Sequence, residues 1–290
     1  MKHTLTAALV GGDVRQAYLG ELLAADGARV RAVGLERSGT ELEAGGALRT
    51  LFAEADVILL PMPVMGTRGR LNAPLANAPY KLTDVLDAIP AGKPVYGGAV
   101  PRMVRDMAAR RGFEVRDYLE REELALRNAI PTAEGAIQIA MEELPFTLHG
   151  LPVLVIGAGR IGMALAPRLR GLGARVTVSA RRYDDFARLY SGGYAALDTR
   201  ALDGQLHAFP LIVNTVPSPV LTRRALADCA PDTLVLDLAS GTGGVADDAG
   251  DLCRVIHALS LPGRVAPRSA AAAIYDTVCH MLEEEGLLCS

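Results

Sequence analysis

The chain has 290 residues, a formal net charge of −3 at neutral pH and a sequence isoelectric point near 6.0. Half of the residues are hydrophobic, which is enough for two domains of ordinary size with a core each. The weak negative charge argues against a general electrostatic grip on nucleic acid or on an anionic membrane, so we expect small molecules or proteins as partners.

No apolar segment approaches the ~20 residues that span a bilayer. The apolar run up to Val10 ends at two glycines without a cleavage pattern, so it predicts a first strand rather than a secretory signal. The cysteines Cys229, Cys253, Cys279 and Cys289 lack metal-ligand spacing. We therefore expect a cytoplasmic protein with free thiols and no metal.

Strand and helix patterns alternate along the N-terminal part of the chain. Strands are predicted at Leu5–Val10, Arg29–Val33, Asp56–Leu60, Pro94–Tyr96 and Glu114–Arg116, with helices notably at Val14–Ala25 and Arg102–Arg110. This alternation implies parallel strands joined by right-handed crossovers.

A connecting segment follows, from Tyr118 to Glu143. Its composition is helical, but Pro131 ends or kinks a helix near Ile130, so we predict a pair of connecting helices. A last helical pattern, Ala270–Glu285, is long enough to return and pack against them.

The C-terminal part repeats the plan, with strands predicted at 152–156, 174–179, 211–214, 233–238 and 254–258. The fold class is therefore α/β, with two doubly wound Rossmann-like domains joined by a long hinge helix pair. We predict a substrate and catalytic domain at 1–118, connecting helices at 119–150, a nucleotide-binding domain at 151–266 and a returning helix at 267–290.

A glycine motif opens the second domain. An apolar strand runs into G-x-G-x-x-G, formed by Gly157, Gly159 and Gly162 around Arg160 and Ile161, and a helical pattern follows. In this context the motif predicts a dinucleotide whose pyrophosphate lies on the helix N-terminus. The alternative is a structural turn of a doubly wound sheet.

The end of the next strand bears on the choice of nucleotide. NAD binders usually place an acid there for the ribose 2′-hydroxyl, whereas this chain has Ser179, Arg181 and Arg182. A serine hydroxyl and two guanidiniums suit a 2′-phosphate, so we predict NADP(H), with NAD as the alternative. A solvated basic loop is the other interpretation.

Ligands of open parallel sheets bind at the carboxyl ends of the strands, so the turns there in both domains are expected to face one cleft. Further cofactor contacts are predicted at Asn214, Thr215, Val216, Pro217, Ala239 and Ser240.

Several longer blocks resemble the A subunits of bacterial dipicolinate synthases. They are Arg121–Ala125, Asn128–Ile137, Thr147–Gly150, Gly157–Gly162, Asn214–Pro217, Asp237–Ser240 and Leu261–Pro267. The resemblance covers nearly the whole chain, and the block at 128–137 is its most specific part. The chain departs from the family at Thr242, where a proline is usual, and at Arg264 and Arg268, where lysines are usual.

The resemblance implies an enzyme of endospore formation that makes pyridine-2,6-dicarboxylate from a lysine-pathway intermediate in the mother-cell cytoplasm. The implied chemistry is loss of water from a 4-hydroxy-tetrahydrodipicolinate, followed by hydride transfer to NAD(P)+. It also implies that the chain acts with a flavoprotein-like B subunit, and we expect a homo-oligomer.

A substrate with two carboxylates calls for cationic forks, and Arg15 and Arg121 are the arginines best placed by sequence, unless they are ordinary surface residues. Asp13 and Gln16 share the turn of Arg15, where Asp13 is equally suited to cap a helix.

The central segment supplies the remaining candidates. Asn128 and Thr132 either line the cleft or satisfy backbone groups freed by Pro131. Glu134 and Glu123 are the candidate general bases, although Glu134 also fits a helix cap.

Two other functions remain open. A 2-hydroxyacid dehydrogenase shares the two-domain plan but relies on a histidine partnered by an acid, and His257 is expected here to be a core histidine inside a strand. A non-catalytic protein that senses NADP(H) is the alternative from another class.

Overall fold

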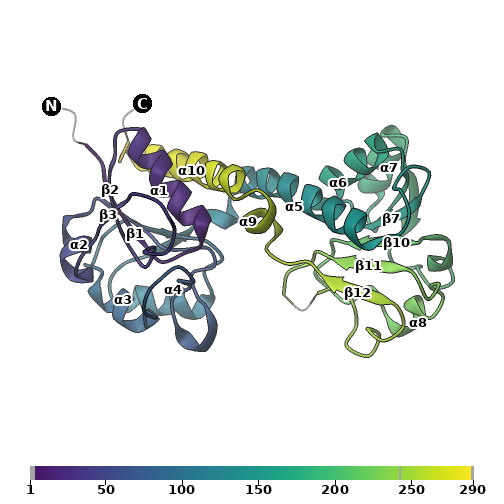
Figure 1. Cartoon of the computed structure of the whole chain (residues 1–290), viewed down its shortest axis with the longest axis horizontal. Coiled ribbons are helices and arrows are strands. Elements are labelled where there is room, and N and C mark those ends of the chain that lie inside the picture. The colour runs from purple at the N-terminus through teal and green to yellow at the C-terminus, as the bar shows by residue number, and fades with distance from the viewer. Residues whose placement is uncertain (1–3, 242, 289–290) are drawn as a thin grey trace. The chain divides into compact units, whose positions relative to one another are not determined.

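The computed structural model describes residues 4–241 and 243–288 and divides the chain into two compact units (Figure 1). Unit 1 runs to Arg127 and resumes at Ala266, and unit 2 comprises Asn128–Val265.

Unit 1 contains a sheet of six parallel strands with helices on both faces. The strands are β1 (Thr6–Val10), β2 (Arg29–Val33), β3 (Glu43–Ala44), β4 (Val57–Leu59), β5 (Val95–Gly97) and β6 (Val115–Asp117), in the order β3-β2-β1-β4-β5-β6. The helices are α1 (Val14–Ala25), α2 (Leu48–Glu54), α3 (Leu82–Ala88) and α4 (Arg102–Ala109), with 3-10 turns η1 (Thr67–Gly69) and η2 (Tyr118–Glu120). The strand β3 was not predicted, because it has only two residues, both exposed.

Alternate residues of β1 enter two separate cores, which shows that both faces of the sheet are covered. Ala8 and Val10 belong to one cluster, and Ala7 and Leu9 to the other. The second cluster includes the apolar face of α10 (Pro267–Glu284), which lies beside α1 (Figure 1). A strand buried on both faces is continuously apolar rather than alternating, as β1 is.

Unit 2 repeats this architecture with β7 (Pro152–Ile156), β8 (Arg175–Ala180), β9 (Ala195–Asp198), β10 (Leu211–Asn214), β11 (Leu234–Asp237) and β12 (Arg254–His257). All pairs are parallel, and the order is β12-β11-β10-β7-β8-β9. The helices are α6 (Arg160–Gly171), α7 (Tyr183–Ser191), α8 (Arg223–Leu226) and α9 (Leu261–Val265), with the 3-10 turn η3 (Leu206–Ala208). The prediction of two doubly wound Rossmann-like domains is confirmed, although β9 was missed.

The predicted pair of connecting helices is one helix, α5 (Glu122–Glu143), with Pro131 inside it. A proline has no backbone N–H, so the carbonyl of Arg127, four residues before Pro131, receives no helical hydrogen bond from it. Arg127 is the last residue of the first segment of unit 1. One turn of the helix thus lacks one bond, while burial of Ala133, Ala136 and Ala140 in the core of unit 2 holds the segment beyond it. Apolar burial therefore outweighs the helix-breaking tendency of Pro131.

The described residues contain no helix that is long and apolar enough to cross a membrane. They also contain no group of three or more His, Cys, Asp or Glu side chains that could hold a metal ion.

Candidate functional site

The strand order of each unit reverses between two central strands, which is where doubly wound folds bind ligands. In unit 2 these strands are β7 and β10, so the turn from Gly157 to Gly162 lies beside the turn that begins at Asn214. The two outer glycines of the motif are required by the fold itself. Gly157 has φ +102, and a Cβ there would lie 2.6 Å from Thr215 Oγ1; a Cβ on Gly162 would collide with the carbonyl oxygen of Gly157.

The middle glycine is different, because the chain does not require it. Gly159 has φ −83, which any residue adopts, and apart from its own chain neighbours and helix no described atom lies within 4 Å of a Cβ built there. It occupies the N-cap of α6, where a glycine has no side chain with which to cap the helix. Glycine at an N-cap is explained when a ligand must approach the backbone, and the N-terminus of a helix is a position that suits an anion.

The corresponding turn of unit 1 is filled by its own side chains. Asp13 caps α1 by accepting from the backbone N–H of Arg15 at 3.0 Å, at the position that Gly159 has in unit 2. Gln16 stands where unit 2 has Gly162, and its Nε2 donates to the carbonyl of Leu59 at 2.9 Å. This turn therefore cannot accept a pyrophosphate in the way the turn of unit 2 does.

Arg15 is only 7% exposed and is held in place by two groups. Its Nε and Nη2 donate to both carboxylate oxygens of Asp13, and Nη2 also donates to the carbonyl of Met62 at 3.0 Å. The structure thus brings Asp13, Arg15 and Gln16 together at the carboxyl edge of the sheet, with Arg15 already paired to one carboxylate.

The contacts of Arg121 argue against a role in substrate binding. Its guanidinium donates to both carboxylate oxygens of Glu284, at 2.8 and 2.7 Å, and to Glu123 at 2.8 Å. The hydrogen bonds that it donates to Glu284 and to Glu123 raise the pKa of Arg121. The arginine connects the end of α10 to the start of α5, a contact between residues far apart in the sequence.

Glu123 is also poorly suited to act as a base. A hydrogen bond with its own backbone N–H, and then the one from Arg121, lower the pKa of its carboxyl group. A carboxylate stabilised in its charged form is a weaker proton acceptor at neutral pH.

The candidates on α5 in unit 2 do not gather around the glycine turn. Glu134 is exposed, and its Oε1 lies 3.7 Å from Nε of Arg168. Arg168 is roughly 12 Å along α6 from the first residue of that helix, which follows the glycine turn. Thr132 donates its hydroxyl to the carbonyl of Asn128 at 2.7 Å, the usual bond of a helical threonine to the carbonyl four residues earlier, and Asn128 is not the residue whose carbonyl Pro131 frees. Asn128 Oδ1 is buried with no hydrogen-bond partner among the described residues.

The expected contact of Ser179 with a 2′-phosphate is wrong for this structure. Ser179 is fully buried, and its hydroxyl pairs with the hydroxyl of Thr199 at 2.8 Å. The reason is β9, which was not predicted and which pairs with β8 so that Thr199 covers the serine.

The two arginines that follow Ser179 are both exposed. Arg181 has no side-chain partner among the described residues, and Arg182 pairs with Asp184 at 2.9 and 2.6 Å. The neighbouring acid in register with Ala180 is Asp198, whose pKa is lowered to about 2 by its hydrogen bonds from Arg200. The end of β8 is therefore cationic, and the acid beside it, Asp198, is paired with Arg200.

The predicted contacts at the ends of β10 and β11 form a second part of the edge. Asn214 is fully buried, and Thr215 donates its hydroxyl to the carbonyl of Ile156, which fixes this turn against the glycine turn. The side chain of Val216 also lies next to Gly157, because a Cβ on that glycine would be 2.9 Å from Cγ2 of Val216. Pro217 and Ser240 are exposed at the same edge, and Ala239 is buried.

Sequence reasoning missed one pair at this edge, Asp237 and His257. His257 was expected to be a core residue, but its side chain is 59% exposed, with Nδ1 3.4 Å from Oδ2 of the fully buried Asp237. The strands predicted at 233–238 and 254–258 each run one residue past the observed carboxyl ends of β11 and β12. The prediction therefore did not show that Asn214, Asp237 and His257 are each the last residue of a strand.

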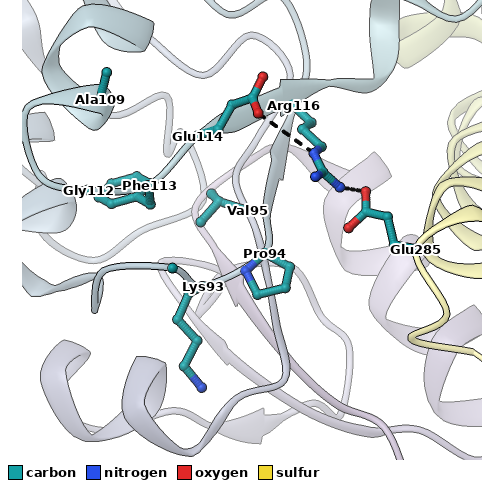
Figure 2. A pocket seen from close by; sticks show the side chains of 10 residues that line it. Lys93, Pro94, Val95, Ala109, Gly112, Phe113, Glu114, Arg116 and Glu285 are labelled. Carbon is teal, nitrogen blue, oxygen red and sulfur yellow. Dashed lines mark ion pairs between the residues drawn. The ribbon is translucent and has the colours of Figure 1, made fainter.

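Figure 2 shows a pocket of about 370 Å³ in unit 1, at the amino ends of β5 and β6. Its charged side chains are engaged with one another: Arg116 forms ion pairs with Glu114 and Glu285. Lys93 donates to backbone carbonyls, at 3.1 Å for Ala53. The pocket lies at the opposite edge of the sheet from the one where doubly wound folds bind ligands.

Known families match both parts of the chain. Residues 6–119 match the family described as the N-terminal domain of the A subunit of dipicolinate synthase, and residues 144–240 match the family described as putative NAD(P)-binding. The A subunit of dipicolinate synthase from Bacillus subtilis (strain 168) is 32% identical over 292 residues, which cover 97% of this chain and 96% of that protein.

Two crystal structures are similar over nearly their full length. The A chain of dipicolinate synthase from Bacillus subtilis gives a TM-score of 0.88 at 31% identity, covering 98% of this chain and 97% of that one. The A subunit from Bacillus halodurans gives 0.87 at 28% identity, covering 96% and 97%.

Proposed function

The chain belongs to the family of dipicolinate synthase A subunits, and on that premise we propose that it oxidises a ring derived from hydroxy-tetrahydrodipicolinate to pyridine-2,6-dicarboxylate. The reaction consists of loss of water and then of NAD(P)-dependent oxidation. Aromatisation of the ring provides the driving force.

The observation that carries the proposal is the middle glycine of unit 2. Gly159 costs the helix a cap and is not needed by the backbone or by packing, whereas its counterpart Asp13 caps α1. The residues present therefore fit the pyrophosphate of a dinucleotide in unit 2 and not in unit 1.

A bound nicotinamide nucleotide supplies a two-electron acceptor for hydride. The chain's own part is to bind and orient. The turn from Gly157 to Gly162 holds the pyrophosphate, and the turn after β10, fixed by Thr215 on Ile156, borders it on the nicotinamide side.

We propose NADP(H) rather than NAD(H) as the nucleotide. Support comes from Arg181, which is exposed and unpaired among the described residues, and from the pairing of the neighbouring acid Asp198 with Arg200. Arg182 is held only by a solvent-exposed ion pair with Asp184, which water and salt screen and which a phosphate can replace.

For the substrate carboxylates, Arg15 stays our candidate. Its Nη1 donates to no group among the described residues, while Asp13 and Met62 fix the rest of the guanidinium. A guanidinium already held in one orientation loses little side-chain entropy when it binds a carboxylate.

The name of the family implies a second subunit, and we propose that this chain works with a B subunit in spore formation. The test uses purified chain with enzymatically made hydroxy-tetrahydrodipicolinate and NADP+ or NAD+, with and without that subunit. We expect the absorbance of the pyridine product and of the reduced nucleotide to rise together. Nucleotide binding without turnover under all four conditions would instead identify a sensing subunit.

A further inference from the structure

Three polar residues form a row across the carboxyl edge of unit 2. In the register of the sheet, Asn214 of β10 pairs with Asp237 of β11, and Asp237 pairs with His257 of β12. In-register residues of parallel strands point to the same face, so the three side chains stand next to one another.

The carboxylate in the middle of the row is fully buried and held by three donors. Asn214 Nδ2 donates to Oδ1 at 2.8 Å, as does the N–H of Ala239 at 3.2 Å, and the N–H of Gly244 donates to Oδ2 at 2.8 Å. No arginine or lysine of the described chain pairs with Asp237. A buried carboxylate without a cation is costly, and the ionisable side chain that stands against Asp237 is His257, with Nδ1 3.4 Å from Oδ2.

The turn that covers this row is adapted to it. A Cβ on Gly243 would lie 2.7 Å from Asp237 Oδ2, and a Cβ on Gly244 would collide with Asn214 Nδ2. Gly243 also has φ +77, a region that favours glycine. Larger residues at these positions would break the row, so the fold has room for it only because both are glycine.

The row lies in the half of unit 2 that serves the nicotinamide. A doubly wound dinucleotide fold consists of two mononucleotide halves, and the end of β8 receives the adenosine ribose. The strands β10, β11 and β12 form the other half. A group that exchanges protons during hydride transfer has to lie on this side.

We propose that His257 accepts the proton released in the oxidation, and that Asp237 is its positioning residue. The inference rests on the function proposed above. The C–H bond broken on the dihydropyridine ring transfers its electron pair as hydride to the nicotinamide. The proton from the ring nitrogen or the neighbouring carbon goes to Nε2 of His257, and the electrons of that bond complete the aromatic ring.

The geometry determines which nitrogen is available. Nδ1 lies 3.4 Å from the buried carboxylate, which favours the tautomer with the hydrogen on Nδ1 and leaves Nε2 of the exposed ring as the acceptor. The carboxylate also stabilises the imidazolium that forms. Because β12 is an edge strand, β11 is its only neighbour in the sheet, and Asp237 is the charged group that faces the imidazole from it.

The chain contains a matched control in the same unit. His207 is 64% exposed and has Nδ1 2.9 Å from Asp228 Oδ2, so it is also an exposed histidine paired with an aspartate. It lies in η3, which precedes β10 and thus belongs to the opposite edge of the sheet. His207→Gln therefore removes an imidazole paired with an aspartate at the edge of the sheet where no hydride transfer is proposed.

The experiment compares wild type, His257→Gln and His207→Gln in steady-state turnover between pH 5.5 and 9 and in nucleotide binding. We expect kcat to fall about a hundredfold or more in His257→Gln only, as for loss of a general base. We expect nucleotide Kd to stay within about twofold in both variants. The fall of kcat/KM towards low pH should lose its histidine inflection in His257→Gln, and free imidazole should partly restore His257→Ala.

A second readout does not depend on turnover. Nitrogen-15 NMR of the imidazoles in the full chain, assigned by the signal lost in His257→Gln, should show the Nδ1–H tautomer for His257. The opposite tautomer would overturn the proposal, as would a His257→Gln rate equal to that of His207→Gln. A wild-type chain that binds nucleotide without turnover refutes the proposed function instead, so the two failures are distinguishable.

Discussion

Replacing Gly159 with aspartate should raise stability and abolish nucleotide binding at once. Unit 1 provides the template, because Asp13 caps α1 with φ −91 and ψ −168, while Gly159 has φ −83 and ψ −167. An aspartate at 159 can therefore adopt the same cap without strain, and no described atom lies within 4 Å of the new Cβ beyond the residue's own chain neighbours and helix.

The magnitudes follow from the two roles of the helix N-terminus. A cap in place of glycine adds a few tenths of a kcal/mol, and a carboxylate at the positive end of the helix adds ~0.3–1 kcal/mol. Together they should raise Tm by roughly 1–4 °C.

The effect on binding is larger and has the opposite sign. The carboxylate takes N–H groups from the pyrophosphate, a loss of ~1.5–3 kcal/mol for one charge-assisted bond. It also repels the phosphates by up to about 4 kcal/mol at 4 Å in a partly exposed site. Even half of the sum lowers the affinity at least about a hundredfold.

The assay is titration of NADPH fluorescence, which a chain without tryptophan does not obscure, together with thermal unfolding of the same samples. Gly171→Asp is the control: it adds the same charge at the other end of α6, again with no described atom within 4 Å outside its own helix and chain neighbours. It should lower Tm slightly, because a carboxylate is disfavoured there, and leave binding unchanged. Wild-type affinity in a folded Gly159→Asp variant would refute the assignment of the pyrophosphate to this turn.

Three further changes test other parts of the structure. Arg181→Ala combined with Arg182→Ala should weaken NADPH tenfold or more in fluorescence titration and NADH much less; equal weakening of both would exclude a 2′-phosphate contact. Glu284→Gln should lower Tm at pH 7, because the hydrogen bond from Arg121 lowers the pKa of Glu284 and so stabilises the fold above the unfolded pKa. This difference from wild type should vanish as the pH falls below the pKa of the folded carboxyl group, and a difference that persists at low pH would mean that the ion pair is not its cause. Gly162→Ala should lower the unfolding free energy by ~1–3 kcal/mol or more, because its Cβ meets a backbone carbonyl, and unchanged chemical denaturation would show that the turn can relax.

Much of the fold and part of the site were determined by local sequence. The strand before Gly157, the glycine spacing and the helical pattern after it lie within one short segment, so their physics is local and the sequence predicts them. The alternation of strands and helices likewise implied two parallel sheets. The strands β3, with two exposed residues, and β9, with two exposed and two half-buried ones, gave no such signal.

The tertiary structure alone decided which side chains are available for chemistry. Arg121 is occupied by Glu284, which is 163 positions away, and Ser179 is covered because β9 brings Thr199 next to it. The row of Asn214, Asp237 and His257 exists only through the register of three strands. A local pattern determines what a segment becomes, but the partner of a polar side chain comes from wherever the fold brings another strand or helix, and that partner decides whether the group binds a ligand or holds the protein together.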